Sequence, residues 1–169
     1  MAKTSLYEQV QGFLEKDDWQ CRRVGERTLE VRVRSGHTGH IIDIYCDPED
    51  RFVRLYIDSY AQVPVEARGV VALELLRWND DELMTRYCMA EGVVDVDVVI
   101  PVSGALKAKT FFYVLRQLYL SADWHFPKLM KLIWGDWQED QERAGFGGPA
   151  GEAGTGAGAG EDASDDIPF

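Results

Sequence analysis

Two stretches in the first half of the chain carry apolar residues at the spacing of an amphipathic helix. The first covers about residues 6–17, and Ser5 with Glu8 forms the capping-box pattern that opens a helix. The second covers residues 64–79, where Pro64 suits a first helical turn. We expect its packing residues to be Val70, Val71, Leu73, Leu75, Leu76 and Trp78.

A third helical stretch, at about residues 107–137, is the longest. Pro127 lies inside its apolar stripe, and a proline removes a backbone donor and crowds the preceding turn. We therefore expect a kink near residues 123–126. The stripe consists of Phe111, Val114, Leu115, Leu118, Ala122, Phe126, Leu129, Met130 and Ile133.

Between the helical stretches, apolar and polar residues alternate with the period of a β-strand. In residues 28–34, Leu29, Val31 and Val33 alternate with charged residues. Similar runs, separated by turns, predict strands at 41–46, 52–58, 83–89 and 93–100, and 19–24 is a further candidate at the start of the meander.

These elements follow one another in the order α-βββ-α-ββ-α. The pattern predicts an α+β domain over residues 1–137, with an antiparallel sheet flanked by three helices. After Trp137 the composition changes, and residues 145–160 are mostly glycine and alanine. Such a segment buries too little apolar surface to offset its chain entropy, so we expect residues 138–169 to form a disordered tail.

The net charge of −11 is unevenly distributed. Residues 136–169 hold nine acidic residues and one basic residue, which gives −8, and the other 135 residues hold 20 and 17, which gives −3. The acidic balance disfavours non-specific binding to a phosphate backbone. The three widely spaced cysteines, the absence of a signal-peptide pattern and the lack of a membrane-spanning apolar run predict a cytoplasmic protein.

Candidate catalytic and metal-binding residues are few. His37 and His40 flank a glycine-containing turn without companion ligands, so we expect a solvent-facing turn rather than a metal site. His125 is expected to be a packing residue, and Asp95 and Asp97 to be solvated strand positions. The sequence therefore predicts a non-enzymatic protein with no metal and no cofactor.

The strand region is rich in arginine. Arg32, Arg34 and Arg54 fall on polar positions of the predicted strands and could form a basic sheet face for single-stranded nucleic acid. Acidic residues such as Glu30 and Asp43 lie between them, so an ion-paired, solvated face is the alternative.

Residues from position 63 onward resemble the YbjN family, whose fold is similar to that of type III secretion chaperones. The resemblance is carried by VPVEARGVVALELLRWND (63–80), by VDVDVVIPVSG ending at Gly104 and by ADWHFPKLMKLIWG (122–135). Together with the order of elements, it spans about residues 4–137. It implies a small α+β protein, usually dimeric, that presents groove and sheet surfaces to a protein partner.

The end of the chain resembles the acidic tip of bacterial single-stranded-DNA-binding proteins, which docks onto replication, recombination and repair proteins. The resemblance is carried by Asp165, Asp166, Ile167, Pro168 and Phe169. Phe169 supplies an aromatic anchor, Pro168 lowers the cost of ordering, and the two aspartates suit a basic rim. A simple solubilising acidic tail is the alternative.

The sequence predicts a protein-binding homodimer that acts as an accessory in DNA replication or repair through partner proteins. Trp124, Trp134 and Trp137 supply more aromatic surface than one helix face usually buries, so they are the candidate dimer surface. Direct nucleic-acid binding and a secretion-type chaperone or regulator remain the alternatives.

Overall fold

The computed structural model describes residues 4–36 and 38–135. Three helices lie in this part of the chain: α1 (Leu6–Lys16), α2 (Arg68–Asp81) and α3 (Ala108–Trp134), with a short 3₁₀ turn at Val65–Ala67. The strands are β1 (Cys21–Arg23), β2 (Thr28–Arg34), β3 (Gly39–Cys46), β4 (Phe52–Gln62), β5 (Arg86–Ala90) and β6 (Val93–Pro101).

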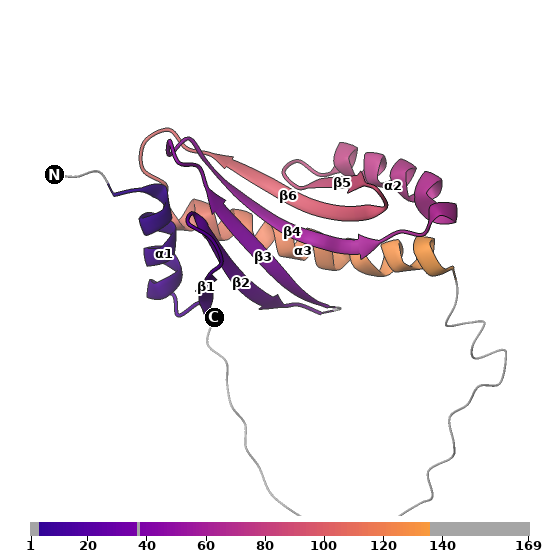
Figure 1. Ribbon diagram of the computed structural model, residues 1–169, viewed down its shortest axis with the longest axis horizontal. Helices are drawn as coiled ribbons and strands as arrows, with labels where there is room; N and C mark the ends of the chain where they lie inside the picture. The colour runs from indigo at the N-terminus through magenta and orange to yellow at the C-terminus, as the bar shows by residue number, and fades with distance from the viewer. Residues whose placement is uncertain (1–3, 37, 136–169) are drawn as a thin grey trace, which may run out of the picture. The chain divides into compact units, whose positions relative to one another are not determined.

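The six strands form one antiparallel sheet in the order β1-β2-β3-β4-β6-β5 (Figure 1). The predicted α+β class and the order of helices and strands are therefore confirmed, with the candidate stretch 19–24 supplying β1. None of the helices within the described ranges is long and apolar enough to cross a membrane.

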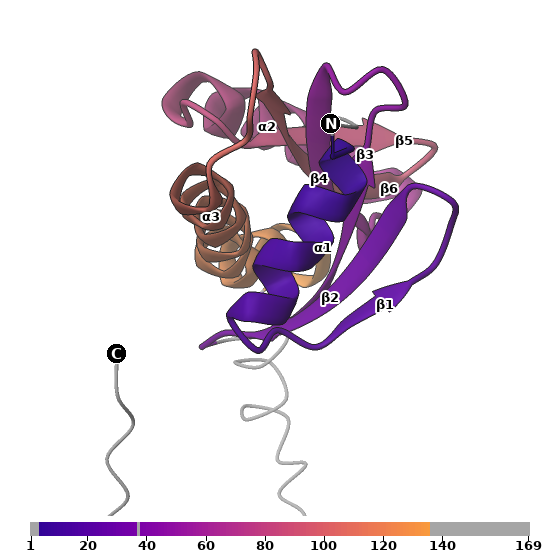
Figure 2. The same ribbon diagram turned by 90° about the vertical axis from the view of Figure 1, so that its left-hand side faces the viewer.

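All three helices pack on the same face of the sheet, as Figure 2 shows. The buried side chains of α1 are Leu6, Val10 and Leu14, which recur at helical spacing. The strands contribute every second residue to the same core, because successive side chains of a strand point to opposite faces. The other face of the sheet carries no helix in the described part of the chain.

The long helix α3 completes this core. Seven residues of its predicted stripe are buried, whereas Phe126 and Met130 are half-buried. The helix continues through Pro127 to Trp134. Near the proline, the buried Tyr60 hydroxyl donates a hydrogen bond of 2.5 Å to the Ala122 carbonyl. Tyr60 thus adds a donor to the carbonyl of the residue before Asp123, whose own carbonyl is the one to which Pro127 cannot donate a helical hydrogen bond.

The predicted start of the strand at 83–89 is wrong, because β5 begins at Arg86. Asn79 helps to fix this position. Its side-chain amide donates to the Tyr87 carbonyl at 2.8 Å, and its side-chain oxygen accepts from the Tyr87 N–H at 2.7 Å. Asn79 therefore occupies backbone groups that an edge strand would otherwise leave open.

The prediction for α2 is also partly wrong. Only Val71, Leu75 and Trp78 are buried. The other three apolar residues, Val70, Leu73 and Leu76, are exposed. The helix is apolar around more of its circumference than the sheet can cover.

Candidate functional site

A group of exposed aliphatic side chains surrounds α2. Leu73 and Leu76 are 62% and 66% exposed, and Leu83 is fully exposed. We call this group the α2 patch; its members are Val65, Val70, Leu73, Leu76, Leu83 and Met84. Large apolar side chains gathered on a surface are typical of a binding site.

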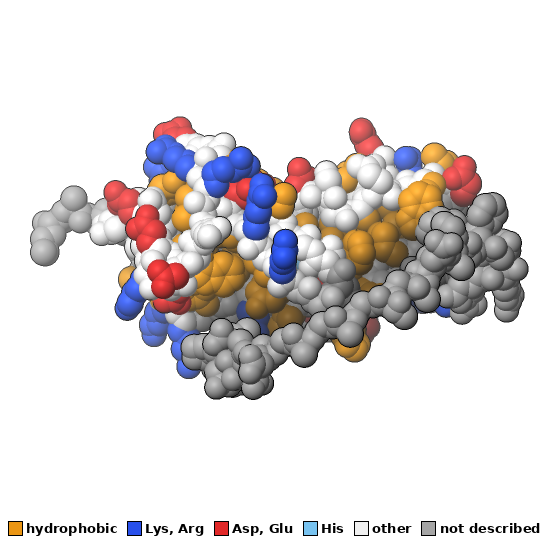
Figure 3. Space-filling model, turned by 90° about the horizontal axis from the view of Figure 1, so that it is seen from below, with side chains coloured by type: hydrophobic (Ala, Val, Ile, Leu, Met, Phe, Trp, Pro, Cys, Tyr) orange, Lys and Arg blue, Asp and Glu red, His pale blue; other side chains and the backbone are white. Residues whose placement is uncertain are grey.

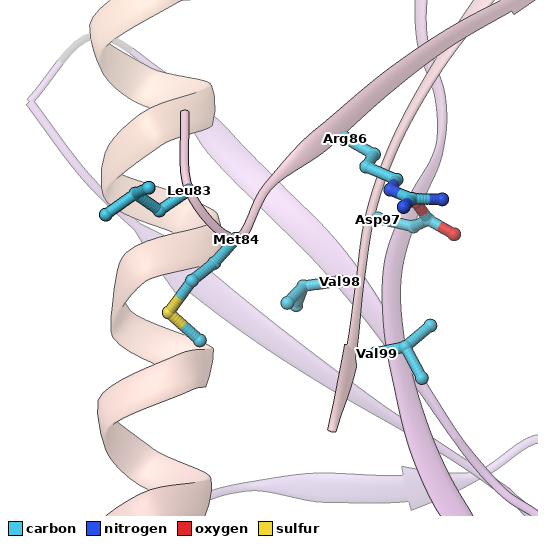
Figure 4. Close-up of a pocket in the computed structure, with 6 residues that line it drawn as sticks. All are labelled: Leu83, Met84, Arg86, Asp97, Val98 and Val99. Carbon is cyan, nitrogen blue, oxygen red and sulfur yellow. The ribbon is translucent and has the colours of Figure 1, made fainter. Parts of the chain in front are cut away.

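The α2 patch continues into a pocket of about 350 Å³ at the edge of the sheet. Leu83 and Met84 line it from the segment before β5, and Arg86, Asp97, Val98 and Val99 complete its wall (Figure 4). The pocket thus joins exposed apolar side chains to an arginine.

Among the described residues, no strand lies against the edge of β6 next to this pocket. The β5 pairing ends at Arg86 opposite Asp97, so β6 pairs with β4 alone from Val98 to Pro101. The Val102 N–H donates to the Arg51 carbonyl. Because bonded and non-bonded positions alternate along an antiparallel pair, Val99 directs its backbone N–H and C=O away from β4. These groups can accept an extended segment.

The open face of the sheet holds the predicted arginines Arg32, Arg34 and Arg54, all exposed. Carboxylates neutralise much of this charge. Arg54 lies 2.7 Å from Asp97, and Glu30 lies 2.7 Å from Arg22 and 3.5 Å from Arg32. The strand register places the two carboxylates, Glu30 and Asp97, in one row across the sheet, which runs through Arg22, Glu30, Asp43, Tyr56, Asp97 and Arg86.

The electrostatics of this row agree with an ion-paired face. The hydrogen bond from Arg22 lowers the pKa of Glu30. Burial and the neighbouring Glu30 raise the pKa of Asp43. These ion pairs and pKa directions agree with the ion-paired alternative, and nucleic-acid binding by this face stays a prediction.

A polar cluster links α3 to the segment after α2. The Glu82 carboxylate accepts a hydrogen bond of 3.0 Å from the Ser121 hydroxyl and lies 3.3 Å from His125 Nε2. The Tyr87 hydroxyl is 2.8 Å from that of Ser121. The ring of His125 stacks on Trp78, with centroids 4.2 Å apart, so His125 is a packing residue as predicted. Burial lowers its pKa, although Glu82 acts in the opposite direction.

The histidine turn differs from the prediction. His37 lies outside the described residues, and His40 is buried rather than solvent-facing. His40 pairs with Val33 on the inner face of β3 and packs against Tyr60. Burial lowers its pKa. The described residues contain no group of three His, Cys, Asp or Glu side chains that could hold a metal ion.

Two of the three predicted dimer tryptophans are on the surface. Trp124 is 79% exposed and Trp134 is 61% exposed, whereas Trp137 lies outside the described residues. The predicted tail residues 165–169 also lie outside them. From below, hydrophobic side chains lie beside lysine and arginine side chains on the described surface (Figure 3).

Comparison with known proteins places the domain in a family. Residues 6–129 match the YbjN family, which is described as "Putative bacterial sensory transduction regulator". The chain belongs to the YbjN family. No curated protein sequence matches it.

Solved structures with the same fold include a YbjN-family protein and a secretion complex. The crystal structure of E. coli YbjN, described as a putative transcription regulator, has 13% identity and a TM-score of 0.53, over 80% of this chain and 92% of that one. A chain of the heterodimeric ExoU–SpcU complex from the Pseudomonas aeruginosa type III secretion system has 12% identity and a TM-score of 0.50, over 74% and 98%. At such low identity, these similarities establish the fold alone.

The sequence did not reveal the α2 patch of this YbjN-family domain. Val70, Leu73 and Leu76 are apolar and lie in a helix, which by itself predicts that they pack in the core. A usable signal was present: a helix that is apolar on most of its circumference needs more than one surface to cover it. The pocket had no comparable signal, because it depends on where β5 begins.

Proposed function

We propose that this YbjN-family chain is a non-enzymatic protein-binding module that forms a homodimer through the α2 patch. The observation that supports the proposal most is the exposure of neighbouring aliphatic residues along α2 and its flanking segments. In a two-fold symmetric dimer, the α2 helices of two copies would pack against each other and cover the same leucines on both. The Trp124 and Trp134 surface is the alternative dimer surface.

The expected strength of this contact follows from the exposure of two leucines. Leu73 and Leu76 are 62% and 66% exposed. Complete burial of a leucine side chain contributes about 2 kcal/mol, so each of these would contribute about 1.3 kcal/mol. A symmetric dimer buries each residue twice, which gives about 5 kcal/mol, or a more than thousandfold effect on the dimer Kd.

Sedimentation equilibrium tests the dimer. The double variant Leu73→Asp/Leu76→Asp should be monomeric at concentrations where the unchanged protein is dimeric, with an unchanged circular dichroism spectrum. Trp124→Asp is the matched control on the alternative surface and should leave the mass of the dimer unchanged. A monomeric native protein, or loss of the dimer only in the tryptophan variant, would contradict the proposal.

The open edge of β6 and its pocket suit a partner protein. An extended segment can add to an exposed strand by backbone hydrogen bonds and place side chains in an adjacent pocket. Here Val99 offers the backbone groups for these hydrogen bonds, and Leu83 and Met84 offer the apolar contact. The sheet face is less suited to nucleic acid, because Asp97 and Glu30 engage Arg54 and Arg32.

We further propose that the C-terminal residues 165–169 recruit proteins of DNA replication or repair. The support is in the sequence: two aspartates precede an apolar end that closes with Phe169. An aromatic anchor together with a carboxylate-rich segment suits a basic pocket with an apolar floor.

A pull-down with full-length protein tests this role. The Phe169→Ala variant should no longer capture proteins that bind the acidic tip of single-stranded-DNA-binding proteins. The control variant Ser164→Ala, changed just before the acidic pair, should capture them normally. Equal capture by both variants would refute the role of the tail.

A further inference from the structure

The outward side of α3 carries a line of cationic, aromatic and aliphatic side chains. From Lys109 to Trp124 its members recur three or four residues apart, and Trp134 follows ten residues later, close to three helical turns, so they share one face of the helix. All are exposed, while the intervening Phe111, Val114 and Leu118 are buried. We call this line the α3 stripe; it consists of Lys109, Tyr113, Arg116, Leu120, Trp124 and Trp134.

The charge of α3 differs from that of the other helices. Within Ala108–Trp134 there are four basic residues and one acidic residue, which gives +3, whereas α1 and α2 each have a net charge of −1. The acidic residue is Asp123, whose carboxylate accepts a hydrogen bond from the Thr38 N–H. One of the basic residues, Lys128, pairs with Glu74 of α2. The stripe itself includes two cations, Lys109 and Arg116, and none of its six residues is acidic.

The side chains of the stripe are those that carry most of the binding energy at protein interfaces. Tryptophan, tyrosine and arginine are enriched at such energetic centres. Tyr113 and Trp124 are 57% and 79% exposed and eleven residues apart, which corresponds to about 16 Å along the helix. Lys109 and Arg116 lie at the Tyr113 end, where they would meet carboxylates.

These observations favour an acidic peptide over nucleic acid. The stripe holds two cations, Lys109 and Arg116, at one end only, whereas a nucleic acid carries a phosphate charge at every nucleotide and would need cations along its whole length. Leu120 supplies an aliphatic contact between the aromatic ones. We propose that the α3 stripe binds an acidic segment of a partner protein that presents phenylalanine or leucine between its carboxylates. The inference rests on the proposed protein-binding function and names the partner chemistry for a second surface.

Fluorescence anisotropy of a labelled peptide tests this site on the full-length protein. The probe is a 12-residue peptide in which pairs of glutamates alternate with single phenylalanine or leucine residues. It should bind at low ionic strength and weaken in high salt, because exposed charges are screened. Lys109→Glu/Arg116→Glu and, separately, Trp124→Ala should each weaken binding at least tenfold.

The controls separate a specific site from general attraction. Lys16→Glu/Arg34→Glu changes the net charge equally at exposed positions elsewhere and should bind the peptide like the unchanged protein. A peptide with lysine in place of glutamate should not bind. Equal binding of the two peptides, equal loss in both charge variants, or binding of a 12-nucleotide oligothymidylate in place of the peptide would overturn the inference.

The two proposals fail in different measurements. Lys109→Glu/Arg116→Glu should retain the dimer mass in sedimentation, because α2 is unchanged. Leu73→Asp/Leu76→Asp should retain peptide binding. Loss of peptide binding in the leucine variant would overturn the assignment of the site to α3.

Discussion

Replacing Tyr60 by phenylalanine removes a single hydroxyl from the centre of the domain. That hydroxyl donates to the Ala122 carbonyl in the turn before Pro127, while the ring packs against Phe126 and Tyr87. Only the hydrogen bond is lost in Tyr60→Phe, because phenylalanine keeps the ring. The substitution therefore isolates the contribution of this donor.

The magnitude follows from the burial of the site. Tyr60 is only 8% exposed, so water does not readily replace the lost donor. Leaving a buried acceptor without one of its partners costs about 1–3 kcal/mol. For a domain of this size each kcal/mol corresponds to about 3–5 °C, so we expect the melting temperature to fall by roughly 3–15 °C.

Urea unfolding followed by tryptophan fluorescence measures this change. Tyr60→Phe should lower the midpoint without changing the slope, since the surface exposed on unfolding stays the same. Tyr113→Phe is the matched control, because Tyr113 is 57% exposed, and its stability should change by less than about 0.5 kcal/mol. If the two variants have the same stability, Ala122 does not depend on Tyr60 and the reasoning is refuted.

Three further predictions concern pH, thiol reactivity and a turn. Burial lowers the pKa of His125 and His40 below the ordinary value near 6.5, so both imidazoles bind a proton more tightly in the unfolded chain than in the folded protein. The free energy of unfolding should therefore decrease as pH falls through 6.5. A urea midpoint that does not change between pH 7.5 and 5 would contradict this prediction. Burial raises the pKa of Cys46 to about 12, so a thiol reagent should label the exposed Cys88 in the native protein and Cys46 only after unfolding. Rapid labelling of Cys46 in the native Cys21→Ser/Cys88→Ser variant would disprove this prediction. Gly92 has φ +89° beside the Arg68 guanidinium, so Gly92→Ala should destabilise the protein by about 1–2 kcal/mol in urea unfolding, whereas Gly12→Ala, at an open helical position, should not.

The local pattern of the sequence was sufficient for the helices and most strands. The capping pair Ser5 and Glu8 forms as predicted, and its hydrogen bonds are present at the start of α1. The alternation in residues 28–34 corresponds to β2, with Leu29, Val31 and Val33 facing the core. These features depend on residues close together in the chain, so their periodicity can be recognised without knowing the fold.

The order of strands and the surfaces were decided only by the tertiary structure. The sequence did not reveal that β6 lies between β4 and β5, where Asp97 meets Arg54. Tyr60 faces inward because the strand register shifts between Ile57 and Ala61, which the alternation did not indicate. Whether an apolar residue such as Leu73 is buried depends on which element covers it, and those elements are distant in the sequence. Periodicity defines the faces of an element, but only long-range packing determines which of those faces remain free to bind.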